Sequence, residues 1–134
     1  MEPVITTYLV DTNILIYYLA GALSPEQKHV VDPILEGSFT ISIITRIELL
    51  GWKGHTPDGL VKARRLLDCA RCLPVTIPLA EKAIELRASM NISLPDAVIA
   101  ASALSLDAIL VTRNDHDFAR VPGLKVLNPF RNGE

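Results

Sequence analysis

Acidic residues follow two apolar segments that have the character of buried strands. Asp11 comes directly after the β-prone run at 6–10, and Asp115 and Asp117 lie just past the apolar run at 108–111. In a parallel α/β sheet, the groups that bind ligands gather at the carboxyl ends of the strands. These three carboxylates are therefore expected to share one edge of a sheet.

Two further acids lie near the start of predicted helices. Glu48 follows the predicted strand at 39–44 by four residues, in the first turn of a helix that Thr45 is expected to cap. Asp96 lies in the first turn of another predicted helix, directly after a proline. An acid in a first helical turn is favoured by the helix dipole alone, and an aspartate in a loop is a common turn residue, so a purely structural role is the alternative.

The neighbours of Asp11 and Glu48 weaken that alternative, because both acids are flanked by core-type apolar segments. A buried carboxylate is costly unless it is paired or bound to a metal. The only cations near in sequence are Arg46 and Arg113. A shared divalent cation would satisfy the whole cluster, and a set of oxygen ligands suits Mg²⁺ or Mn²⁺ better than zinc.

Metal ions held by carboxylates can cleave phosphodiester bonds. One ion lowers the pKa of the attacking water and a second stabilises the leaving oxygen, and four carboxylates can hold two ions about 4 Å apart. Such a mechanism needs no histidine, so His55 and His116 are predicted to be surface residues. Polar neighbours could orient the ligands or hydrogen-bond a bound water: Thr12, Asn13, Thr112 and Asn114.

The elements that must position these residues alternate between strands and helices. Strands are predicted at 6–10, 39–44, 74–77, 108–111 and 124–127. Helices are predicted at 14–20, 25–36, 45–50, 60–70, 78–90 and 97–106. Ser24 and Gln27 are expected to form a capping box at the start of the second of these, and 128–134 is expected to be a frayed tail. This alternation predicts an α/β fold, a three-layer sandwich with a central, mostly parallel sheet of about five strands. The length of 134 residues fits one domain, covering 1–134.

Composition and charge narrow the class of protein. The chain is 49% hydrophobic and 21% charged, as expected for a globular protein, and its net charge of −2 disfavours binding of nucleic acid through a global basic field. No apolar run reaches the roughly 18 residues of a membrane span, and no signal peptide is evident, so a cytoplasmic protein is expected. Cys69 and Cys72 form a single CxxC, which is expected to be two thiols rather than a zinc site.

Four segments of the chain resemble the signature blocks of PIN-domain ribonucleases, most closely those of the VapC-type toxins of bacterial and archaeal toxin–antitoxin pairs. They are LVDTNIL at 9–15, ITRIEL at 44–49, LPDAVIAA at 94–101 and LVTRNDHDF at 110–118. The closing VPGLKVL at 121–127 is similar too. The resemblance covers nearly the whole chain, with the segments in the order of the family.

The resemblance implies an endoribonuclease that depends on Mg²⁺ or Mn²⁺ and acts on single-stranded regions of structured RNA. By motif, Asp11, Glu48 and Asp96 would be the first three metal ligands. The family often has an acid two residues after the threonine, where this chain has Asn114. Asp115 and Asp117 are the available substitutes for the fourth ligand, and this departure from the family concerns the second metal more than the first.

The resemblance also implies a cognate antitoxin as partner and a homodimer. Apolar residues of the first helix could form a groove for an antitoxin helix or a dimer face, although core packing explains most of them: Ile16, Tyr17, Tyr18 and Leu19. Basic residues could contact RNA phosphates, with a solvated helix face as the alternative: Arg46, Lys62, Arg64 and Arg65.

Other functions fit the sequence less well. A phosphoryl-transfer protein with an aspartate nucleophile would be expected to carry an Asp-x-Asp pair after its first strand and a lysine near the end of the last one. This chain has Asp11-Thr12-Asn13 at the first place, and Lys125 lies within the predicted last strand, where it is poorly placed to bind a phosphoryl group. A PIN-like processing nuclease without an antitoxin stays open. So does a binding module with a degraded site, because of Asn114, although the presence of Asp11, Glu48 and Asp96 argues against it.

Overall fold

A five-stranded parallel sheet forms the centre of the molecule in the computed structural model, which describes residues 5–131. The strands lie in the order β3-β2-β1-β4-β5, and all four neighbouring pairs are parallel. Their bounds are β1 Tyr8–Val10, β2 Thr40–Ser42, β3 Arg71–Leu73, β4 Ile109–Val111 and β5 Lys125–Leu127. The predicted α/β sandwich is confirmed, and the first strand is its central one.

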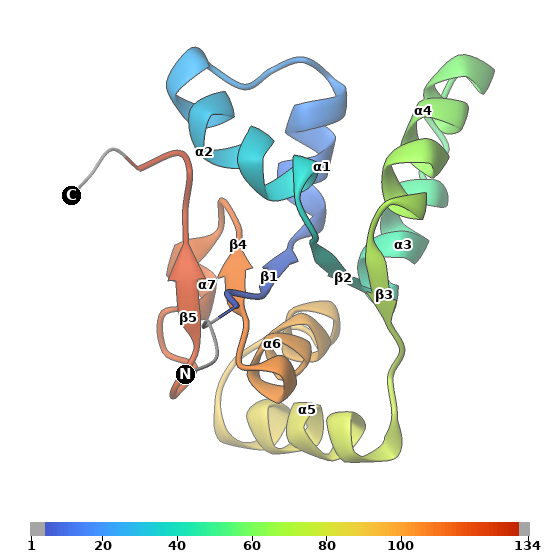
Figure 1. Ribbon diagram of the computed structural model, residues 1–134. Coiled ribbons are helices and arrows are strands. Elements are labelled where there is room, and N and C mark those ends of the chain that lie inside the picture. Colours follow the sequence, from blue (N-terminus) through green and yellow to red (C-terminus); the bar gives the residue numbers. More distant parts are fainter. Residues whose placement is uncertain (1–4, 132–134) are drawn as a thin grey trace.

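Helices cover both faces of this sheet (Figure 1). Leu9 and Leu110 face a core formed with α5 and α6, whereas Val10 and Val111 face a core formed with α1, α2 and α4, because successive strand residues point to opposite faces. The bounds are α1 Thr12–Leu19, α2 Pro25–Glu36, α3 Ile43–Leu50, α4 Pro57–Asp68, α5 Ile77–Ser89, α6 Leu94–Leu106 and α7 Asp115–Phe118. No helix within residues 5–131 has the length and apolar character to cross a membrane.

Side-chain caps begin each of the first six helices. Asp11 caps α1, and the other five begin after a serine or threonine whose hydroxyl accepts a backbone N–H of the first turn: Ser24, Ser42, Thr56, Thr76 and Ser93. Such side chains satisfy N–H groups that have no partner inside the helix. The predicted capping box of α2 is confirmed, since Ser24 Oγ accepts from Gln27 N at 3.2 Å and Gln27 Oε1 accepts from Ser24 N at 2.8 Å.

Replacing Ser24 by alanine should lower the free energy of unfolding by about 1 kcal/mol, because the first turn of α2 loses a hydrogen-bond acceptor. Urea titration followed by circular dichroism measures this change. Ser24→Asn is the matched control and should keep most of the stability, since asparagine caps helices as well as serine does. Equal losses in both variants would show that the cap contributes nothing here.

Three elements differ from the sequence prediction. The third strand is Arg71–Leu73 rather than 74–77, because Arg71 N donates to Phe39 O at 2.9 Å and Pro74 has no N–H with which to extend the ladder. Helix α3 starts at Ile43, capped by Ser42 and not by Thr45, so Glu48 lies in its second turn. The predicted frayed tail at 128–134 is ordered through Arg131, with Phe130 packed on Tyr17, and 132–134 lie outside the described residues.

Candidate acidic active site

Asp11 lies at the carboxyl end of the central strand and is only 5% exposed. Its backbone N–H continues the sheet by donating to Val111 O at 2.9 Å. Its carboxylate accepts from Thr12 N at 2.8 Å and from Thr112 Oγ1 at 2.8 Å. Burial raises the pKa of Asp11 above the usual 3.8 despite these hydrogen bonds, and the negative charges of Asp96 and Glu48 raise it further.

Thr112 and Asn13 both donate a hydrogen bond to the same oxygen of the Asp11 carboxylate, Oδ2. Asn13 Nδ2 donates to Asp11 Oδ2 at 3.1 Å and lies 3.4 Å from Thr112 Oγ1. Thr112 follows β4, and its hydroxyl also accepts from Asn114 N at 3.0 Å. The structure thus places three of the four predicted orienting residues around one carboxylate, and the Asn114 contact is made by its backbone.

Glu48 is an exposed residue of α3 whose carboxylate meets the start of α1. Thr12 Oγ1 donates to Glu48 Oε1 at 2.7 Å and lies 3.0 Å from Thr45 Oγ1. Thr12 is the residue after Asp11, so its hydrogen bond connects the start of α1, where the Asp11 carboxylate lies, to the carboxylate of Glu48. Thr45, predicted as a cap, instead supports this polar contact from inside α3.

Asp96 is half-buried in the first turn of α6, where Ser93 Oγ accepts its backbone N–H at 3.2 Å. Burial raises its pKa, and the negative charges of Asp117 and Glu48 raise it further. These effects require Asp117 and Glu48 to lie near Asp96. Asp117, on α7, is exposed. The negative charges of four carboxylates therefore act on one another in this region of the molecule: Asp11, Glu48, Asp96 and Asp117.

Asp115 behaves differently, because its carboxylate is paired with a cation. Arg131 Nε lies 2.6 Å from Asp115 Oδ2. Although burial raises the pKa of Asp115, hydrogen bonds from Arg131 and Asn128 and the charge of Arg131 outweigh it, so the pKa is lowered. Of the two candidates for a fourth acid, the arrangement favours Asp117.

A divalent cation matches the chemistry of this donor set. The pKa of Asp11 and that of Asp96 are both raised, and no positive charge contributes to either shift. Carboxylate oxygens are the ligands that Mg²⁺ and Mn²⁺ prefer. Among residues 5–131, no three His, Cys, Asp or Glu side chains lie close enough together to hold one ion in common. Glu48 and Asp117 are exposed, so their side chains can rotate on a nanosecond timescale.

Binding of Mg²⁺ or Mn²⁺ should raise the melting temperature more at neutral pH than near pH 4. Without metal, the raised pKa values of Asp11 and Asp96 give stability that is complete below about 3.8 and is lost as the pH rises through the folded-state values. A cation replaces the lost stability by binding the ionised carboxylates, worth about 2.7 kcal/mol at a hundred times its Kd. The melting temperature is measured with MgCl₂ and with NaCl of equal ionic strength. Equal increases in melting temperature with the two salts would contradict a metal site.

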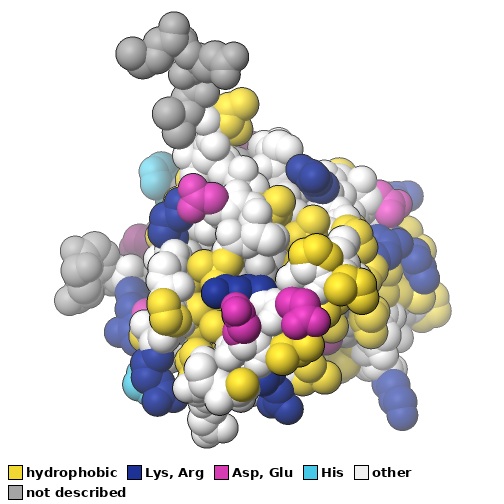
Figure 2. All heavy atoms as spheres, turned by 90° about the horizontal axis from the view of Figure 1, so that it is seen from below, with side chains coloured by type: hydrophobic (Ala, Val, Ile, Leu, Met, Phe, Trp, Pro, Cys, Tyr) yellow, Lys and Arg dark blue, Asp and Glu magenta, His cyan; other side chains and the backbone are white. Residues whose placement is uncertain are grey.

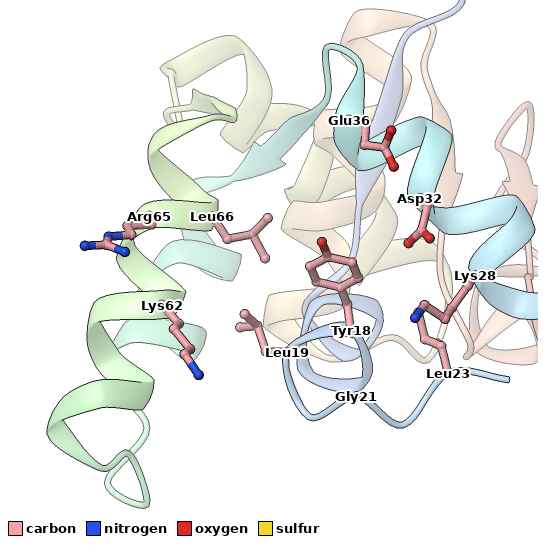
Figure 3. A pocket seen from close by; sticks show the side chains of 10 residues that line it. All are labelled: Tyr18, Leu19, Gly21, Leu23, Lys28, Asp32, Glu36, Lys62, Arg65 and Leu66. Carbon is pink, nitrogen blue, oxygen red and sulfur yellow. The ribbon is translucent and has the colours of Figure 1, made fainter. Parts of the chain in front are cut away.

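The predicted RNA-binding residues lie on two helices. Arg46 is half-buried on α3, and Arg64 is exposed on α4. Lys62 pairs with Asp58 at 3.4 Å and, with Arg65, lines a groove of about 530 Å³ between α4 and the α1–α2 pair (Figure 3). Apolar side chains share the lining of this groove: Tyr18, Leu19, Leu23 and Leu66.

The two histidines that were predicted to be surface residues differ in exposure. His55 is half-buried, with its Nε2 2.6 Å from Leu49 O, whereas His116 is exposed as predicted.

A residue that the sequence analysis did not assign to the site also lies beside it. Arg113 stacks on the rings of Tyr17 and Phe130, and its backbone N–H donates to Asn13 Oδ1 at 3.0 Å. Its position next to Thr112 was the only signal in the sequence. The two rings belong to the first helix and the C-terminal segment, so spacing alone does not bring them together.

Known proteins share this fold. The family model described as PIN domain matches residues 8–124. No curated protein sequence matches the chain. Among solved structures, a toxin–antitoxin complex from Klebsiella pneumoniae is 32% identical, covering 93% of this chain and 99% of that one, with a TM-score of 0.77. VapBC-1 from nontypeable Haemophilus influenzae is 25% identical, covering 94% and 100%, with a TM-score of 0.77. FitAcB from Neisseria gonorrhoeae is 25% identical, covering 93% and 99%, with a TM-score of 0.78.

Proposed function

The chain belongs to the PIN domain family, and from that premise we propose that it is an endoribonuclease that depends on Mg²⁺ or Mn²⁺. The observation that carries the proposal is the buried carboxylate of Asp11 at the end of the central strand, with the negative charges of Asp96 and Glu48 nearby. So costly an arrangement is explained by a cation that the carboxylates bind together. The whole chain, 1–134, would then act as one nuclease domain.

Asp11, Glu48, Asp96 and Asp117 would hold the cation. When bound, a divalent cation supplies a water of lowered pKa and neutralises charge on the phosphodiester. Other side chains of the protein position these carboxylates. Thr112 and Asn13 fix the orientation of the Asp11 carboxylate. Thr12 holds Glu48 toward it, and Ser93 sets the first turn of α6 that carries Asp96.

Cleavage of RNA by the purified protein tests this function. We expect cuts in a labelled, structured RNA with Mg²⁺ or Mn²⁺ and none with EDTA, at sites that mapping places in single-stranded regions. Asp68→Asn is the control for loss of an acid, because Asp68 is exposed and lies just before β3, at the opposite edge of the sheet. Cleavage that persists unchanged in EDTA would contradict the proposal.

We infer in addition that the enzyme is the toxin of a type II toxin–antitoxin pair. Solved relatives at 25–32% identity are toxin–antitoxin and VapBC complexes. The groove in Figure 3 offers apolar side chains edged by both charges, with Lys62 and Arg65 on the α4 wall and Lys28, Asp32 and Glu36 on the α2 wall. Such a groove suits an amphipathic helix of a partner. The test is whether the product of an adjoining reading frame inhibits cleavage by the purified protein.

A homodimer and a cytoplasmic location complete the proposal. Figure 2 views the molecule from the side of α5 and α6, where hydrophobic side chains occupy much of the surface. Three of the large exposed hydrophobic residues belong to these helices: Ile77, Ile84 and Leu94. Exposed apolar patches of this kind are typical of protein interfaces. Sedimentation velocity of the purified protein measures its oligomeric state.

A further inference from the structure

Arg113 is an exposed arginine whose side chain contacts two aromatic rings close to the residues that surround Asp11. Its guanidinium carbon lies 5.0 Å from the centre of the Tyr17 ring and 4.9 Å from that of Phe130. The two rings lie 5.0 Å apart and are tilted by 60°. The guanidinium also donates to the hydroxyl of Tyr17. Together these contacts fix a side chain that would otherwise sample many rotamers.

The backbone of Arg113 is fixed as firmly as its side chain. Asn13 Oδ1 accepts its N–H at 3.0 Å, and Asn128 Nδ2 donates to its carbonyl at 2.9 Å. The same Asn13 side chain donates to Asp11 Oδ2 at 3.1 Å. One amide side chain therefore links the arginine to the central carboxylate, so the position of Arg113 is tied to that of the proposed metal ligands.

The positive charge of Arg113 is not used by any acid in the described part of the chain. The four salt bridges found there involve Lys62, Lys82, Lys125 and Arg131. Arg113 does not contribute to the pKa shift of Asp11 or Asp96. A guanidinium has five N–H donors, and only one of them is engaged, with Tyr17. The rest remain for an anion from outside the chain.

We propose that Arg113, clamped by Tyr17 and Phe130, binds a phosphate of the RNA strand next to the bond that is cut. This inference rests on the proposed function. Contact with the two rings and the Tyr17 hydroxyl leaves other N–H groups of Arg113 for a phosphate, to which an arginine can donate two parallel hydrogen bonds, as lysine cannot. Because Tyr17 and Phe130 already order the Arg113 side chain, binding of a phosphate costs less conformational entropy, and more of the contact energy contributes to affinity.

RNA binding can be measured apart from cleavage in an Asp96→Asn background, using a fluorescein-labelled single-stranded RNA of mixed sequence over a range of salt concentrations. Arg113→Ala should weaken binding roughly ten-fold and reduce the salt slope by about 0.7, the value of one phosphate contact on a single strand. Arg113→Lys should restore the slope but only part of the affinity. Arg71→Ala removes the same charge at the start of β3 and should leave binding unchanged.

Each other outcome has a definite meaning. If the Asp96→Asn parent binds RNA and Arg113→Ala binds it equally well with the same slope, the phosphate contact is overturned and the nuclease proposal stands. If the parent binds no RNA and the unsubstituted protein neither binds nor cleaves it with Mg²⁺ or Mn²⁺, both are overturned. A lower melting temperature with unchanged RNA affinity would make the clamp purely structural. Tighter binding of polyglutamate than of RNA, lost in Arg113→Ala, would assign the guanidinium to protein carboxylates and also overturn the inference.

Discussion

Asp11→Asn is expected to lower the rate of RNA cleavage by about a thousand-fold or more. The variant keeps nearly the shape of the side chain, and asparagine caps helices as well as aspartate does, so α1 should still begin where it does. What it loses is the central negative charge that we propose binds the cation. Charge stabilisation by a metal is worth several kcal/mol, and each 1.36 kcal/mol of barrier is a factor of ten in rate. Initial rates with labelled RNA and Mg²⁺ measure the loss.

Stability separates this loss from misfolding. Without metal, Asp11→Asn should melt at the same temperature as the parent or above it, because a buried negative charge has been removed from among like charges. The stabilisation by Mg²⁺ should shrink at the same time. Asp68→Asn, at the opposite edge of the sheet, should cleave at the parent rate. Full activity of Asp11→Asn would refute the assignment of the metal site.

Phe118→Ala should cost about 3–5 kcal/mol of folding free energy, as other deletions of a buried phenylalanine do. Phe118 is 1% exposed and ends α7 in the core shared with α5 and α6. The loss is a large part of the roughly 5–15 kcal/mol that stabilises a domain. Since α7 carries Asp117, cleavage should also fall at temperatures where the rest of the fold persists. Urea titration and cleavage rates measure the two effects.

His116→Ala is the control for that substitution, because His116 is an exposed residue of the same helix. It should change stability by no more than about 0.5 kcal/mol and leave cleavage intact. A loss below about 1 kcal/mol for Phe118→Ala would mean that α7 is not anchored by this side chain. Normal cleavage in a destabilised Phe118→Ala would instead argue that Asp117 takes no part in the site.

The elements that follow local rules could be predicted from the sequence. Ser24, Pro25 and Gln27 define the start of α2 by themselves, and the apolar runs before Asp11 and after 107 have the pattern of buried parallel strands. The third strand could not be predicted, because its three residues are selected by a backbone bond to Phe39. Ile43 is β-branched and favours a strand, but the cap at Ser42 turns it into the start of a helix.

The acids could be located by motif, but their different environments could not. Nothing in the order of residues shows that Asp115 is neutralised by Arg131, which lies in a segment predicted to be frayed. The contact between Thr12 and Glu48 joins two helices that are remote in sequence. Tertiary contacts of this kind decide which carboxylate of a neighbouring pair keeps its charge for a ligand, so the choice of Asp117 over Asp115 depended on the structure.

The pairing of the central strand with β4 has a consequence for the protein during its synthesis. β1 leaves the ribosome well before its partner β4 and the Thr112 hydroxyl that holds Asp11, which are translated about a hundred residues later. Until then, one edge of β1 has no hydrogen-bond partner from β4. A chain truncated before residue 109 would therefore be inert and prone to aggregate rather than partly active. A nuclease of the proposed kind would therefore spare the messenger RNA that encodes it until this part of the chain has been made.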